Sequence, residues 1–182
     1  IQPTLQSSAQ VGAIKWLCNK LMNSPHRRGD INPIKLKDEA KSTINTFRRF
    51  IRDSTDDDVR LAAGFALLKV ACDTYMEQFI DVRSWSILGL LARDRDEDIS
   101  EQFSKRLVKL LTQRKLKKLC KWGSLLVLRC LATDKGIRDD GQQQLNALLA
   151  CSKRFYSLEK KKADIINDSN KRMRVQQSLQ DL

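Results

Sequence analysis

The sequence has little of what a catalytic or metal-binding site usually requires. Its 182 residues include one histidine, His26, which stands beside two arginines in a proline-containing stretch. The sequence contains no Gly-rich phosphate loop and no cluster of cysteine and histidine, and the aspartates stand where helices are predicted to begin. We therefore predict that the chain is not an enzyme and that it uses no metal, cofactor or small-molecule substrate.

Long hydrophobic runs and paired cysteine motifs are also missing. The longest uninterrupted apolar stretch, residues 61–68, is far shorter than the roughly 20 residues that a membrane-spanning helix needs. The cysteines are odd in number and show no Cys-x-x-Cys spacing. This pattern predicts reduced core thiols in an intracellular protein that has no membrane contact. The cysteines are Cys18, Cys72, Cys120, Cys130 and Cys151.

Alternating strand patterns are absent, and the apolar residues instead recur at helical spacing throughout the chain. In residues 59–70, for example, Val59, Ala63, Ala66 and Val70 fall on one stripe of a helix. This helix is also apolar on its opposite side, which predicts that it lies between neighbours. Helices are predicted near residues 6–23, 35–52, 97–113, 117–132 and 136–155. A further helix is predicted to begin at Asp56, and another, after a turn over residues 73–80, carries Trp85, Leu88, Leu91 and Ala92.

Three of these helices repeat one pattern at offsets of 40 and 38 residues. Such a period is typical of HEAT and armadillo solenoids, in which each helix pair buries its apolar face by stacking on the next pair. The pattern predicts an all-α, HEAT-like superhelix of antiparallel helix pairs. The equivalent positions are Asp56, Asp96 and Asp134, then Val59, Ile99 and Ile137, then Leu67, Leu107 and Leu145.

Two local features of the repeat carry further predictions. Each aspartate stands three residues before the first apolar position, where a carboxylate can cap free amides at a helix start. We interpret these aspartates as helix caps rather than as a solvated acidic loop. Gly64, among three alanines, costs the helix roughly 1 kcal/mol, and this cost favours a close contact with a neighbouring helix.

The expected domain organisation is a helical stack over residues 1–158 and a charged segment over residues 159–182. The stack is interpreted as a fragment of a longer solenoid, because the chain starts at Ile1 rather than at a methionine and neither end resembles a capping repeat. The last segment has weak apolar periodicity, which predicts a frayed helix.

Basic charge is concentrated in the C-terminal half. Residues 1–100 have 15 Lys and Arg against 14 Asp and Glu, whereas residues 101–182 have 19 against 8. Lys117, Lys118 and Lys121 fall where the helix near residues 117–132 begins. A cation near this positive end of the helix dipole costs about 0.3 to 1 kcal/mol. We interpret the cluster either as a solvated face or as a ridge for an anionic partner, which is an acidic protein segment or a nucleic-acid backbone. The candidate contact residues are Lys105, Lys109, Lys115, Lys117, Lys118, Lys121, Lys153 and Arg154.

Several segments resemble one known family. Residues 59–70, including the stretch Arg-Leu-Ala-Ala-Gly at 60–64, and residues 85–90 are similar to the middle repeats of sister-chromatid cohesion proteins of the "precocious dissociation of sisters" family. The basic, tyrosine-containing residues 153–158 also match, and the similarity spans roughly residues 11–160. The sequence departs from the family after the second acidic cap, where the family usually has a valine and an arginine and where Ile99 is here followed by Ser100 and Glu101.

The resemblance implies a nuclear, chromatin-associated scaffold without enzymatic activity that regulates sister-chromatid cohesion. Its expected partners are the cohesin kleisin subunit and the wings-apart-like release factor, and DNA is a further candidate partner of the basic half. Two alternatives stay open, namely a HEAT module that binds nucleic acid directly and a transport or adaptor solenoid.

Overall fold

The computed structural model describes residues 2–24, 33–131 and 135–180. These residues form helices joined by turns, and no strand occurs among them. His26 and Asp134 lie outside the described residues. The α-helices are α1 (Gln2–Met22), α2 (Pro33–Asp53), α3 (Asp57–Ala71), α4 (Val82–Ala92), α5 (Glu97–Thr112), α6 (Leu119–Cys130) and α7 (Lys135–Gln180), and the short 3-10 helix η2 (Met76–Phe79) precedes α4.

The chain divides into two compact units, Ile1–Leu145 and Asn146–Leu182. The first unit contains α1 to α6 and the beginning of α7, and the second contains the rest of α7. At 46 residues, α7 extends well past residue 155, where the periodicity predicted its end. No glycine or proline interrupts the sequence after that point, so nothing in it forces the backbone out of the helix. The proposed boundary at residue 158 stays a prediction.

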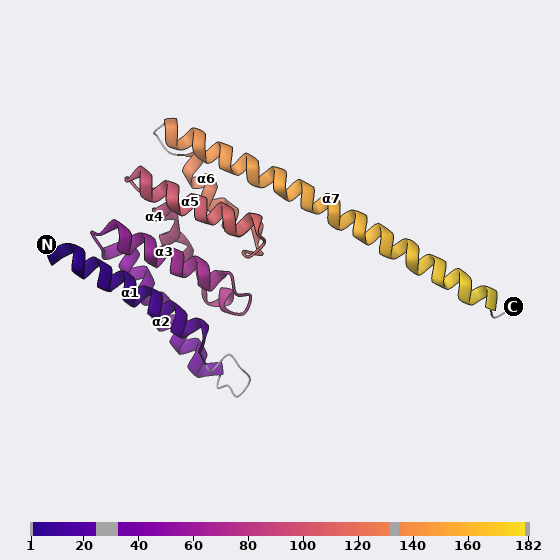
Figure 1. Cartoon of the computed structure of the whole chain (residues 1–182), viewed down its shortest axis with the longest axis horizontal. Helices are drawn as coiled ribbons and strands as arrows, with labels where there is room; N and C mark the ends of the chain where they lie inside the picture. Colours follow the sequence, from indigo (N-terminus) through magenta and orange to yellow (C-terminus); the bar gives the residue numbers. More distant parts are fainter. Residues whose placement is uncertain (1, 25–32, 132–134, 181–182) are drawn as a thin grey trace. The chain divides into compact units, whose positions relative to one another are not determined.

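The helices of the first unit form two layers (Figure 1). Helices α1, α3 and α5 pack side by side in one layer, and α2, α4 and α6 form the other. Successive helices along the chain also contact each other across the layers. This alternation confirms the all-α, HEAT-like solenoid predicted from the repeat.

The repeated apolar positions form the core between these layers. Val59, Leu67, Ile99 and Leu107 are all buried, and α3 packs against α1, α2, α4 and α5. Ile137 and Leu145, at the start of α7, are only half-buried. The third repeat is therefore less enclosed than the first two in the described part of the chain.

Aspartates cap the repeated helices. Asp56 precedes α3 and accepts a hydrogen bond from the Val59 amide at 2.9 Å. Asp96 accepts hydrogen bonds from two amides in the first turn of α5, at 2.9 and 3.4 Å. Hydrogen bonds from the Ser7 hydroxyl and from the Val59 amide lower the pKa of Asp56 below its usual value. Both aspartates therefore act as the helix caps that their place in the repeat predicts.

Gly64 lies at a close contact between helices of the stack. A Cβ atom at this position would lie 2.2 Å from Leu91 Cδ1 and 3.5 Å from the ring of Phe103. The absence of a side chain therefore lets α3 approach α4 and α5, as the run of small residues predicts. Arg60, one turn earlier on α3, binds Asp94 at 3.0 Å and ties α3 to the connection between α4 and α5.

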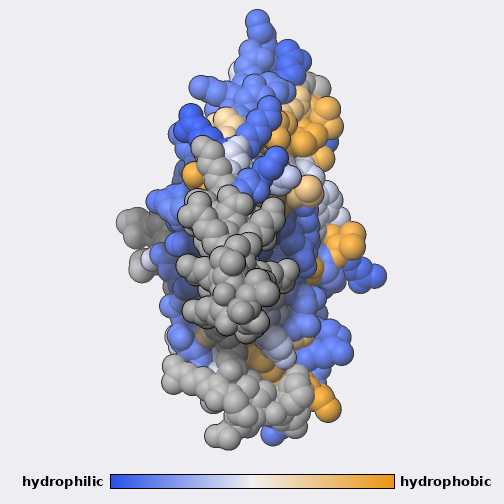
Figure 2. Space-filling view, turned by 90° about the vertical axis from the view of Figure 1, so that its right-hand side faces the viewer, coloured by the Kyte–Doolittle hydropathy of each residue, from blue (hydrophilic) through white to orange (hydrophobic). Residues whose placement is uncertain are grey.

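The prediction that the cysteines are core thiols is wrong for most of them. Cys18 is buried and Cys120 is exposed, while the other three are half-buried, and all five are free. Cys120 is exposed because it lies on the opposite side of α6 from Trp122 and Leu126, which face the core. On the face shown in Figure 2, hydrophilic residues cover most of the coloured surface, and hydrophobic residues form separate groups. None of the described helices combines the length and apolarity required to cross a membrane.

Candidate partner-binding surfaces

Six of the eight predicted contact residues lie in the first unit, with Lys105 in the middle of α5 and the other five around the end of α5 and the start of α6. Lys153 and Arg154 lie on α7 in the second unit, and both are exposed. We call the group in the first unit the basic corner, and it consists of Lys105, Lys109, Lys115, Lys117, Lys118 and Lys121.

The turn after α5 gives the basic corner its shape. Arg114 has φ 55°, a left-handed conformation that glycine usually adopts at the end of a helix. The Lys115 amide donates to the Leu110 carbonyl at 2.9 Å, and the Arg114 amide donates to the Leu111 carbonyl at 3.0 Å. Leu116 then inserts into the core at 2% exposure. The chain thus turns sharply and leaves Lys115 and its neighbour Lys117 on the surface.

The lysines of the basic corner fall into two groups. Lys105 pairs with Glu101 at 2.5 Å, and Lys118 and Lys121 lie 3.3 and 3.9 Å from carboxylate oxygens of Glu77. The other three are exposed, and in the part of the chain that the structure describes they form no ion pair. These unpaired lysines are Lys109, Lys115 and Lys117.

Glu77 changes the interpretation of the helix start at α6. Its side chain is only 5% exposed, and it accepts a hydrogen bond from the buried indole of Trp122 at 3.1 Å. The ammonium of Lys121 also lies 4.8 Å from the Trp122 ring centre. Burial lowers the pKa of Lys121, and the Glu77 carboxylate acts against this effect.

Two of the lysines to which the dipole argument applies therefore have a counter-charge within the protein itself. Helix α6 begins at Leu119, so Lys118 precedes it and Lys121 lies in its first turn. Glu77 supplies the negative charge that offsets their unfavourable position. The position of Lys118 and Lys121 thus follows from packing inside the protein. Lys117 lies two residues before α6 and, unlike Lys118 and Lys121, does not pair with Glu77.

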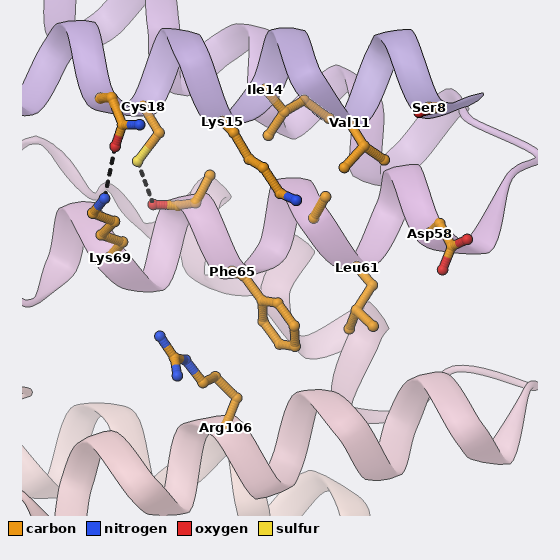
Figure 3. A pocket seen from close by; sticks show the side chains of 13 residues that line it. Ser8, Val11, Ile14, Lys15, Cys18, Asp58, Leu61, Phe65, Lys69 and Arg106 are labelled. Carbon is orange, nitrogen blue, oxygen red and sulfur yellow. Dashed lines mark hydrogen bonds between the residues drawn. The ribbon is translucent and has the colours of Figure 1, made fainter. Parts of the chain in front are cut away.

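A second surface feature is an open groove of about 650 Å³ between α1 and α3, with one residue of α5 at its edge (Figure 3). We call it the α1–α3 groove. The thiol of Cys18 on its α1 side lies 3.8 Å from the Ala66 carbonyl, and the Lys69 ammonium donates to Asn19 at 2.8 Å. Its apolar lining consists of Val11, Ile14, Leu61, Ala62, Phe65 and Ala66.

The charged residues of the α1–α3 groove are mostly basic. Lys15, Lys69 and Arg106 line it together with one acidic residue, Asp58. In Figure 3, Lys15 projects from α1 toward α3, while the Phe65 ring and the Arg106 side chain extend into the space between α3 and α5. The arrangement offers apolar contact and positive charge at one site.

Sequence patterns alone did not identify Glu77 or the α1–α3 groove. Trp122 is 45 positions from Glu77, and no local pattern links the two residues. For the groove, one signal was present, because Leu61 and Phe65 stand on the side of the α3 helix opposite its repeated stripe. The partner helix on that side could not be assigned from the sequence.

These features define a class of protein. The chain is an α-helical repeat protein with a basic corner and an open groove on its surface. Among its described residues, no group of histidine, cysteine, aspartate and glutamate could hold a metal ion. The family model described as "Sister chromatid cohesion protein PDS5 protein" matches residues 2–177. Because the match covers nearly the whole chain, the chain belongs to this family and has a role in sister chromatid cohesion. No curated protein and no solved structure matches it.

Proposed function

We propose that this chain is a non-enzymatic scaffold that regulates sister-chromatid cohesion by binding cohesin subunits on chromatin in the nucleus. The proposed partners are the kleisin subunit and the wings-apart-like release factor. The family match over residues 2–177 carries the proposal. The stacked helix pairs support it, because such repeats create extended surfaces that bind other proteins.

Affinity purification from nuclear extract tests this proposal. We expect a tagged form of the chain to recover the kleisin and the wings-apart-like factor, and to associate with chromatin through S phase and mitosis. Depletion of the protein should weaken cohesion, measured as the separation of paired chromosomal loci. Recovery of nuclear-transport cargo or vesicle-coat subunits in place of cohesin would favour a transport or adaptor solenoid.

A folding-deficient variant provides the control. Val59 is fully buried, so Val59→Asp places a carboxylate in the core and disrupts the first unit. Partners that require the folded surface should be lost with this variant. Proteins recovered equally well with the variant and with the natural sequence bind without a folded surface and do not count as partners.

The basic corner favours nucleic acid as a second candidate ligand. Its Lys109, Lys115 and Lys117 are exposed and form no ion pair with a described residue. The turn between Lys109 and Lys115 contains Arg114, a non-glycine residue in a left-handed conformation. Residues held in such conformations often mark functional sites. Because the chain has a net charge of +12, it should attract an anionic backbone. Lys105, Lys118, Lys121, Lys153 and Arg154 stay predicted contributors to this surface.

Charge reversal separates nucleic-acid binding from a solvated face. We expect Lys109→Glu, Lys115→Glu and Lys117→Glu together to weaken duplex DNA binding equally for unrelated sequences. Each phosphate contact contributes about 0.9 to the slope of log affinity against log salt, so the slope should shrink by roughly 2 to 3. A matched triple reversal of exposed residues on α2 and α4 is the control, at Lys37, Lys41 and Arg83.

The two possible anionic partners predict different results in the same variants. If the basic corner binds an acidic protein segment, DNA affinity will be weak in the natural sequence, while kleisin binding will fall on charge reversal. If neither interaction responds to the reversal, the basic corner is a solvated face.

A further inference from the structure

The apolar lining of the α1–α3 groove is incompletely covered by the protein itself. Ile14 and Leu61 are buried, whereas Val11, Ala62 and Phe65 remain half-buried and line the open space. The volume of about 650 Å³ is ample for several side chains of a ligand. Apolar groups inserted there would remove these surfaces from water, and this burial favours binding.

The charges of the α1–α3 groove are also incompletely paired. Lys15 and Arg106 are exposed, and neither side chain forms an ion pair or hydrogen bond with another described residue. Among the described residues, Lys69 donates to the neutral amide of Asn19 and forms no ion pair, so no carboxylate neutralises its charge there. The described lining contains one acidic side chain, Asp58, and three cations. A ligand that carries carboxylates would therefore complete the electrostatics of the groove.

We propose that the α1–α3 groove is a docking site for an acidic peptide segment of a partner protein, anchored by a large apolar side chain. The anchor packs between Val11, Ala62 and Phe65. Carboxylates next to the anchor bind Lys15 on one side and Arg106 on the other (Figure 3). The guanidinium of Arg106 suits this role because its planar fork can bind both oxygens of one carboxylate.

Nucleic acid fits the α1–α3 groove less well than a peptide does. Single strands bind on several aromatic side chains that stack successive bases, along a continuous basic track. The lining has one aromatic ring, Phe65, and its other apolar residues are aliphatic. The combination of aliphatic contact and separated cations is the complement of an acidic, amphipathic peptide.

Selection from a random peptide library tests the proposal directly. The full chain is immobilised and exposed to phage that display random dodecapeptides. A parallel selection uses Ala62→Glu, which places a carboxylate on the apolar lining and reduces the positive charge of the groove. We expect the natural sequence alone to enrich peptides in which acidic residues flank a leucine, isoleucine, methionine or phenylalanine.

The enriched peptide then serves as a fluorescent probe for affinity measurements. Lys15→Glu combined with Arg106→Glu should weaken its binding by about tenfold or more, because each replaced cation would face a ligand carboxylate. Lys41→Glu combined with Arg83→Glu makes the same charge change on exposed residues of the other layer and should leave the affinity within about twofold. Circular dichroism verifies that all variants are folded. Binding should also weaken as salt increases.

Several results would overturn the proposal. These are failure to enrich any peptide, enrichment of peptides without acidic residues, and equal binding of the probe to the groove variant and the control variant. Tighter binding of a single-stranded oligonucleotide than of any selected peptide, lost in the groove variant, would assign the groove to nucleic acid. The selection does not depend on cohesin subunits being partners, so its outcome and that of the affinity purification can be judged separately.

Discussion

Replacement of Glu77 should destabilise the protein far more than its place in a short 3-10 helix indicates. Its carboxylate is the hydrogen-bond acceptor for the Trp122 indole, which is fully buried, and the counter-charge for Lys118 and Lys121. Glu77→Leu removes the acceptor and the charge together. A net hydrogen bond to a charged group is worth about 1.5 to 3 kcal/mol, and a buried donor left without a partner costs about 1 to 3 kcal/mol.

The two lysines reduce the expected loss, because both retain some access to water. Lys118 is 62% exposed, so hydration can replace much of its interaction with Glu77. We therefore expect Glu77→Leu to cost about 3 kcal/mol of unfolding free energy, mainly through the indole. For a chain of this size, that corresponds to a fall in Tm of roughly 6 to 12 °C.

Two further variants separate the contributions. Glu77→Gln keeps an oxygen acceptor for Trp122 and removes the charge, so it should cost less than Glu77→Leu. Glu101→Gln removes an exposed carboxylate that pairs with Lys105, and it should change stability very little because water screens this pair. Urea unfolding followed by circular dichroism and tryptophan fluorescence gives the three values. If Glu77→Leu were as stable as Glu101→Gln, the buried network would contribute nothing measurable and the reasoning would be refuted.

Three other predictions follow from the packing and the caps. Gly12→Ala should stabilise α1 by up to about 1 kcal/mol, because alanine favours a helix and a Cβ at this position meets open space. Gly64→Ala should melt at a lower temperature than Gly12→Ala, because overpacking against Leu91 offsets the gain in helix propensity, and equal melting temperatures would contradict the close contact. Asp56→Ala should lower the unfolding free energy by about 1 kcal/mol near neutral pH, because it removes the cap of α3. Because folding lowers the pKa of Asp56, its stabilisation is fully present above the unfolded-state pKa and is lost as pH falls through the folded-state pKa, so a pH-independent difference in urea midpoints would be inconsistent with the cap. Asp140→Ala should destabilise the protein more than Arg129→Met, because it leaves the buried guanidinium of Arg129 without the carboxylate that lies 2.7 Å from it. A lower melting temperature for Arg129→Met than for Asp140→Ala would contradict a stabilising role for this ion pair.

The helices and their repeat could be predicted from the sequence because their signals are local. Val59 and Leu67 recur in register with Ile99 and Leu107, and helical periodicity depends only on residues a few positions apart. A cap such as Asp56 binds amides within its own first turn. The same reasoning applies to Gly64, whose unfavourable helix propensity indicates a compensating contact. The family assignment also rests on these segments.

The partners of each side chain across helices were decided by the tertiary structure. Lys118 and Lys121 belong to the same basic stretch of the sequence as Lys117. The fold nevertheless brings these two to Glu77 and leaves Lys117 on the surface without an ion pair to any described residue. Likewise, the α1–α3 groove joins Lys15, Phe65 and Arg106 from three helices. Periodicity determines which face of a helix is buried but contains no information on the rotation and offset between two packed helices. Contacts between distant residues depend on that geometry, so the division of the basic corner and the charge pattern of the groove emerged only from the folded chain.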